Sequence, residues 1–140
     1  MDGIHNELIS AAWQGHTETV QLLLAVPEID VNIQNQDGSC ALTHAASEGH
    51  VGTVQVLLAV PDIDINIQDM GGFSALILTV WKGFTETVRM LLAVPDINVN
   101  IQSIFGRSAL IHAANEGHTE TVQMLLAMPD IDVHMQDQDG

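Results

Sequence analysis

The side chains that could bind a metal or catalyse a reaction are seven histidines, one cysteine and 18 acidic residues in a chain of 140. Zinc-binding helices place two histidines four residues apart, nucleophilic serines lie in a Gly-x-Ser-x-Gly turn, and phosphate-binding loops are rich in glycine. None of these patterns occurs in the sequence. Cys40 is expected to be a small buried thiol instead of a nucleophile. We therefore expect no enzymatic activity, no metal site and no cofactor.

The acidic residues offer one alternative to that expectation. Seven of them recur at equivalent places in successive stretches of 34 residues, so stacking of those stretches would align the seven as a ladder along one edge. A Ca²⁺ site needs six or more oxygen atoms within about 2.6 Å of one point, and rungs about 10 Å apart cannot converge in that way. We expect a solvated, solubilising face, with loose accumulation of cations as the alternative. The residues are Glu28, Asp30, Asp62, Asp64, Asp96, Asp130 and Asp132.

The charge balance excludes several classes of partner. Three Lys and Arg residues stand against 18 Asp and Glu, which gives a formal net charge of −15. Nucleic acids and anionic membranes are bound through basic patches, so neither is expected as the main partner. Lys82, Arg89 and Arg107 all lie in the second half, so the first half carries almost unrelieved negative charge. We expect a protein partner with a basic surface, or else a charge that only maintains solubility.

Three further features bear on where the protein resides. The N-terminal stretch MDGIHNEL is polar and acidic, unlike a secretory signal. No apolar run approaches the length of a membrane span. A single cysteine excludes an internal disulfide framework and fits a reducing compartment. These features predict a cytoplasmic protein.

A 34-residue repeat runs through the whole chain. Gly15 and Gly49 lie one period apart, and leucine and proline recur with the same period. Apolar residues have helical spacing over 42–46 and again over 54–58, whereas residues 63–68 alternate between apolar and polar as an extended segment does. Each copy is therefore predicted to form a helix that ends at a turn glycine, a second helix and an extended loop. All copies are predicted to belong to one domain. The predicted repeats span approximately residues 5–38, 39–72, 73–106 and 107–140.

The repeated residues resemble the ankyrin repeat, here in a 34-residue variant. A tetratricopeptide array shares the period but lacks both the turn glycine and the Asp-Val-Asn loop. The resemblance implies an all-α solenoid of four stacked helix-turn-helix units with extended loops and β-turn tips. It also implies a non-catalytic module that binds another protein on the concave surface formed by the turn tips and first helices. The matching residues of the second copy are Asp37, Gly38, Leu42, Ala45, Ala46, Gly49, His50, Val54, Leu57, Leu58, Asp64, Ile65 and Asn66.

The same resemblance bears on the histidines and on the loop asparagines. It implies a structural role for His16, His50 and His118, which follow the repeated glycine. His44 and His112 are equivalents two units apart, roughly 20 Å, so they cannot share a metal ion. The loop asparagine can be hydroxylated in some ankyrin proteins, but the simpler expectation is that it bonds its own loop. Its copies are Asn32, Asn66 and Asn100, with His134 at that place in the last unit.

Positions at which the copies differ indicate binding residues. Both tryptophans fall at one place in the first helix, and the turn tips change from polar to apolar in the later copies. Stacking should gather Trp81 and the apolar tips into one patch, and Trp, Arg and Met are enriched at recognition surfaces. The alternative is that the phenylalanines fold down over the turns while Trp81 packs on Val80. The predicted binding residues are Trp81, Lys82, Met70, Phe73, Ile104, Phe105 and Arg107, with Trp13 peripheral.

The two ends of the array differ in polarity. Asn6, Glu7 and Ser10 make the first unit resemble a polar cap, whereas the last unit keeps an interior pattern. The C-terminal face is therefore expected to stack on another copy or to continue into further repeats. A second functional hypothesis is thus a structural spacer, or a fragment of a longer ankyrin array. The flexible side chains expected to mediate self-association are Met124, Met128 and Met135.

Overall fold

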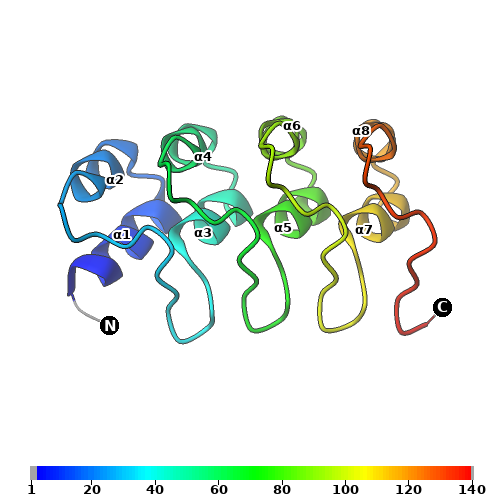
Figure 1. Cartoon of the computed structure of the whole chain (residues 1–140), viewed down its shortest axis with the longest axis horizontal. Coiled ribbons are helices and arrows are strands. Elements are labelled where there is room, and N and C mark those ends of the chain that lie inside the picture. Colours follow the sequence, from blue (N-terminus) through cyan, green and yellow to red (C-terminus); the bar gives the residue numbers. More distant parts are fainter. Residues whose placement is uncertain (1–2, 140) are drawn as a thin grey trace.

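Four helix pairs stack side by side in the computed structural model, which describes residues 3–139 (Figure 1). Those residues form eight helices and no strand, so the predicted all-α fold is confirmed. The first helices of the pairs form one row, the second helices form another, and the connecting loops project beyond the first row (Figure 1). The helices are α1 (Gly3–Gln14), α2 (Thr17–Leu24), α3 (Ala41–Ser47), α4 (Val51–Leu58), α5 (Ala75–Lys82), α6 (Thr85–Leu92), α7 (Ala109–Asn115) and α8 (Thr119–Leu126).

Helix boundaries follow from local residue chemistry. Ser74 Oγ accepts a hydrogen bond of 3.3 Å from the backbone N–H of Ile77 and so caps the start of α5. Helix α5 ends at Gly83, whose φ of +79° lies in the left-handed region that favours glycine. Gly49 adopts the same conformation, with φ of +75°, which confirms the predicted stop between the two helices of a pair. Each second helix ends shortly before a proline, whose ring cannot continue it.

Repeated leucines and valines form the core. Each odd-numbered helix packs against the next odd-numbered helix, and the even-numbered helices pack in the same way. Leu8, Leu42 and Leu76 are almost completely buried between these layers, and Val20 and Val54 are fully buried beneath the second row. Burying such a side chain stabilises the fold by about 1.5–3 kcal/mol. The 34-residue apolar pattern therefore fixes how neighbouring pairs stack.

In the first three pairs, the glycine that follows the first helix also provides space for a ring from the next pair. A Cβ atom at Gly15 would lie 2.6 Å from Nδ1 of His50. The same ring donates a hydrogen bond of 2.9 Å from Nε2 to the backbone carbonyl of Trp13. Phe84 covers Gly49 in the next pair. The structural role implied for His50 is thus supported by its contacts.

The side chains of the loop asparagines link neighbouring units, so the expectation that each residue bonds its own loop holds only for its backbone N–H. Asn66 Nδ2 donates a hydrogen bond of 2.9 Å to the carbonyl of Asp96, and Asn66 Oδ1 accepts one of 2.8 Å from the N–H of Asn98. Both partners belong to the following loop, because the stacked loops lie within reach of a short amide side chain. Asn32 and Asn100 form the equivalent pairs of bonds. The asparagines therefore form a ladder across the stack.

The loop predicted to be extended is bent. Residues 63–68 contain a turn at Ile65 and Asn66 and form no strand. Asp64 Oδ1 accepts a hydrogen bond of 3.0 Å from the N–H of Asn66, which stabilises the turn. Ile65, at the bend, is 2% exposed. The alternation of apolar and polar residues does not reveal the turn.

Candidate functional site

A pocket of about 190 Å³ lies between the last two helix pairs. We call it the Trp81 pocket. Helix α5 supplies Trp81, the preceding loop supplies Phe73, and the loop before α7 supplies Phe105 and Arg107. The structure thus brings together four of the predicted binding residues. The complete lining is Phe73, Trp81, Ser103, Phe105, Arg107, His112, Asn115 and Glu116.

Aromatic rings form one wall of the Trp81 pocket. Phe73 and Trp81 stack with ring centroids 5.9 Å apart and planes inclined by 15°. His112 lies 6.3 Å from Phe73 and 6.0 Å from Trp81. Trp81 remains 45% exposed and Phe105 52% exposed, whereas Phe73 is half-buried. Trp81 and Phe105 therefore keep about half of their surface open to solvent, whereas Phe73 packs against its neighbours.

One histidine of the wall is held neutral. His112 is 6% exposed, and its Nε2 atom has no hydrogen-bond partner among residues 3–139. Burial lowers the pKa of His112, and the Arg107 guanidinium lowers it further, while Glu116 acts in the opposite direction. In the equivalent place two units earlier, His44 Nε2 lies 3.4 Å from the amide of Asn35. Serine occupies the corresponding position 103, where its shorter side chain leaves His112 without that contact.

Arg107 is oriented by the acidic last loop. Its Nε lies 3.3 Å from a carboxylate oxygen of Asp137, and its Nη2 lies 3.8 Å from one of Asp139. The Arg107 side chain is 40% exposed, so the interaction positions the guanidinium without removing it from solvent. Surface ion pairs of this kind stabilise a fold by at most about 1 kcal/mol. The ion pair between Arg107 and Asp137 therefore mainly orients the guanidinium group.

Hydrogen bonds hold the loop tips in fixed positions. Asp69 Oδ1 accepts bonds of 2.9 Å from the N–H of Gly71 and 3.0 Å from that of Phe73. The N–H of Ile104 donates a bond of 2.9 Å to the carbonyl of Gly71, which joins one tip to the next. Gln68 Nε2 donates both within its own loop and to the following loop. Phe73 is therefore presented from a defined turn.

The remaining predicted residues lie outside the Trp81 pocket. Met70 is 73% exposed and Ile104 is 58% exposed at neighbouring loop tips, and Lys82 is exposed at the end of α5. Trp13 is 52% exposed and lines a separate pocket between the first two units. The three residues predicted to mediate self-association are half-buried. They are Met124, Met128 and Met135.

Comparison with protein families identifies the architecture. The family model described as ankyrin repeats (3 copies) matches residues 8–103 and 61–137. The chain belongs to the ankyrin-repeat family. Ankyrin repeats are generally protein–protein interaction modules, and domains built from them are typically non-enzymatic. Among curated proteins, no sequence matches this ankyrin-repeat chain closely enough to count as a relative.

The sequence did not lead us to predict that two histidines of this ankyrin-repeat surface pack against the tryptophan rings. His44 and His112 contact Trp13 and Trp81, with centroids 6.1 and 6.0 Å apart. Each histidine follows its tryptophan at the same spacing, which is close to one repeat period. That shared spacing is the signal that could have revealed both pairs. Equivalent residues in adjacent ankyrin repeats lie side by side, so near-period spacing predicts contact.

Groups suited to metal binding do not gather in the described part of this ankyrin-repeat chain. Residues 3–139 contain no cluster of three His, Cys, Asp or Glu that could hold a metal ion. Cys40 is 1% exposed, and burial raises the pKa of its thiol, so it stays protonated at neutral pH. Within the same residues, no helix is long and apolar enough to cross a membrane.

Proposed function

We propose that this ankyrin-repeat chain binds another protein, and that the Trp81 pocket and the loop tips beside it form the contact. The observation that carries the proposal is the exposure of Trp81 and Phe105 around one pocket, at 45% and 52%. Covering large rings removes apolar surface from water. Tryptophan and arginine are also the residue types that contribute most at recognition surfaces, and Arg107 lines the same pocket. Membership of a family of interaction modules supports the coarser part of this proposal.

Preorganisation of the loop tips supports the same surface. The tips are tied to one another by backbone bonds such as that from Ile104 to Gly71. A surface that is already ordered loses less conformational entropy when a partner binds. Phe73 and Arg107 are both fixed by neighbours before binding. The exposed residues can therefore contribute to affinity without first being ordered.

The charge of the chain supports a partner with a basic surface. The formal net charge of −15 attracts a positively charged protein and steers its approach. Cys40 is a free thiol, so a reducing, cytoplasmic compartment also fits the proposal.

Mapping the contact face of the full chain tests the proposal. A peptide selected from a random library for binding would be titrated into ¹⁵N-labelled chain, and amide NMR shifts would be followed. We expect the largest shifts in α5, α7 and the loop tips over 68–73 and 102–107. Shifts confined to α2, α4 and α6 would contradict the proposal.

A second candidate function is that of a structural segment whose last helix pair stacks on another copy or on a further repeat. Val133 is 54% exposed, whereas the equivalent Val31, Ile65 and Val99 are 4%, 2% and 3% exposed. A Cβ atom at Gly117 would meet nothing within 4 Å, although the glycines of earlier pairs are covered by the next unit. The face of the last pair therefore presents residues that are buried at every interior junction. Another copy or a further repeat stacked there would bury them.

Charge placed on that face should prevent association between copies. We expect Val133→Asp to keep the chain monomeric at concentrations at which the unmodified chain associates, because a buried unpaired carboxylate is costly. Light scattering over a concentration series measures the effect. Leu22→Asp is the matched control, since Leu22 is 74% exposed on α2 and remote from the face. An unmodified chain that remains monomeric throughout the series would rule out self-association.

A further inference from the structure

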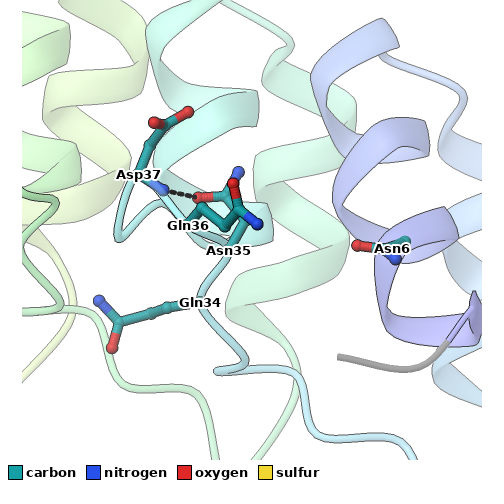
Figure 2. A pocket seen from close by; sticks show the side chains of 5 residues that line it. All are labelled: Asn6, Gln34, Asn35, Gln36 and Asp37. Atoms are coloured by element: carbon teal, nitrogen blue, oxygen red, sulfur yellow. Dashed lines mark hydrogen bonds between the residues drawn. The ribbon is translucent and has the colours of Figure 1, made fainter.

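A groove lies between α1 and the loop that precedes α3. Two pockets of about 440 and 540 Å³ share Asn6, Asn35 and Asp37 in their linings, so they adjoin one another. Figure 2 shows Asn6 on α1, across from Asn35 and Asp37 on the loop. Trp13 and His44 line the first of these pockets. We call the combined space the Trp13 groove.

Trp13 is fixed in this groove but not covered. Its Nε1 donates a hydrogen bond of 3.1 Å to Oε1 of Glu48. The indole ring lies 6.1 Å from that of His44, inclined by 47°. Even so, Trp13 remains 52% exposed. The structure therefore holds an aromatic ring in one orientation with about half of its surface open to a ligand.

The surroundings of the groove are negatively charged. Burial lowers the pKa of His44, and the carboxylates of Asp37, Glu48 and Asp69 act in the opposite direction. Asp37 lines the groove itself. The sequence contains no Lys or Arg before Lys82, so neither residue type is present in the first two units. An open indole beside carboxylates is an arrangement that attracts a cation.

The geometry points to a binding site for a lysine or arginine side chain of the protein partner in the Trp13 groove. The hydrocarbon stem would lie along Ile9 and the indole of Trp13, and the charged head would reach Asp37 and Glu48. This assignment rests on the proposed function, because the side chain belongs to the same partner that covers the Trp81 pocket. It specifies that the partner places a basic side chain at a second contact, in the Trp13 groove.

The second ring pair makes the assignment more specific. Trp81 and His112 repeat the arrangement of Trp13 and His44 two units along the stack. That pocket also contains a carboxylate, Glu116, but its wall includes the Arg107 guanidinium, which the Trp13 groove lacks and which disfavours a basic side chain relative to an apolar one. Two units separate the sites by roughly 20 Å, which an extended chain spans in about six residues. The partner segment therefore carries a basic residue about six positions from a bulky apolar residue.

A pair of small probes tests the cation site directly. N-acetyl-arginine amide and its neutral isostere, N-acetyl-citrulline amide, would be titrated separately into the ¹⁵N-labelled full chain while the two indole N–H signals are followed. We expect arginine to shift the Trp13 signal saturably and citrulline to bind at least about fivefold more weakly. Equal binding of both probes at Trp13, or no saturable shift of its signal, would overturn the assignment.

Charge-removing variants separate the site from a general effect of net charge. Asp37→Asn and Glu48→Gln each remove one carboxylate, and the glutamine amide can still accept the bond from Trp13 Nε1. Both should weaken arginine binding severalfold. Glu86→Gln removes the same charge from the exposed first turn of α6 and should have no such effect. Equal weakening by all three variants would show that only net charge matters and would overturn the site.

A two-site peptide distinguishes this assignment from the proposed function. The probe carries arginine and leucine about six positions apart in a Gly-Ser chain, and the control peptide carries the two side by side. We expect the spaced peptide to bind more tightly, with Trp13→Ala removing the preference for arginine and Trp81→Ala removing the preference for leucine. If Trp81→Ala does not change the preference for leucine while Trp13→Ala removes that for arginine, the proposed function is contradicted. If Trp13→Ala does not change the preference for arginine while Trp81→Ala removes that for leucine, the cation site is overturned and the proposed function stands.

Discussion

At the scale of single residues, His112 connects the fold to the exposed aromatic surface. Its ring lies against both Phe73 and Trp81, and it is buried without a hydrogen bond at Nε2 among the described residues. A neutral imidazole tolerates this environment, whereas an imidazolium does not. His44 has the same direction of pKa shift, with burial as its largest cause. Both rings therefore make the folded state sensitive to acid.

That sensitivity predicts the direction of the pH dependence. Because burial lowers the pKa of His112 in the folded state, the unfolded chain takes up its proton first as the pH falls. The stabilisation is complete above the ordinary pKa of about 6.5 and is lost as the pH falls below it. We expect His112→Gln to flatten this part of the profile of unfolding free energy, measured by urea denaturation between about pH 7.5 and 5.

A matched variant controls for the loss of any histidine. His134 is exposed in the last loop, so His134→Gln should leave the profile unchanged. An unfolding free energy that rises as the pH falls through this range would contradict the placement of a neutral His112 in the wall of the Trp81 pocket.

At the scale of elements, glycine between the two helices of a pair has two separable roles. Gly15 and Gly117 share the left-handed conformation, with φ of +75° and +69°. Only Gly15 is covered by a ring, that of His50. Gly117→Ala should therefore cost about 1–2 kcal/mol of unfolding free energy for the backbone conformation alone. Gly15→Ala should cost measurably more, because its Cβ would also collide with His50. Equal losses in thermal or urea denaturation would show that the ring does not constrain the stack.

Most of this element-level structure could be predicted from the sequence, because it depends on local periodicity. The spacing of leucine and glycine encodes helices and their stops without reference to distant residues. The bonds of the Asn66 side chain to the next loop could not be predicted, since they depend on the distance between stacked loops. The bend at Ile65 was not predicted because the alternation of apolar and polar residues does not reveal the hydrogen bond from the Asn66 N–H to Asp64. By contrast, the gathering of Phe73, Trp81, Phe105 and Arg107 could be predicted, because stacking of neighbouring units is enough to bring them together. The partly buried position of Phe73 depended on ring contacts that spacing does not reveal.

At the scale of the whole molecule, charge should control the rate of binding. The formal net charge is −15, and all three basic residues lie in the second half of the chain. Attraction of a basic partner is long-ranged at low salt and is screened within about 8 Å at physiological ionic strength. We expect the association rate constant, measured by stopped-flow fluorescence, to fall about tenfold between low and physiological salt while the dissociation rate constant changes little. An association rate that is independent of salt would exclude steering.

Binding by a Trp81 variant tests the central claim most directly. Trp81→Ala removes an exposed ring from the pocket wall, so we expect it to weaken binding of a selected peptide by about 2 kcal/mol or more. The variant should still fold cooperatively, because Trp81 is 45% exposed. Leu22→Ala, which removes an apolar side chain that is 74% exposed on α2, should leave both affinity and stability nearly unchanged. If Trp81→Ala instead lowers the unfolding temperature strongly and the variant binds with unchanged affinity, the ring belongs to the core and the account of this surface is contradicted.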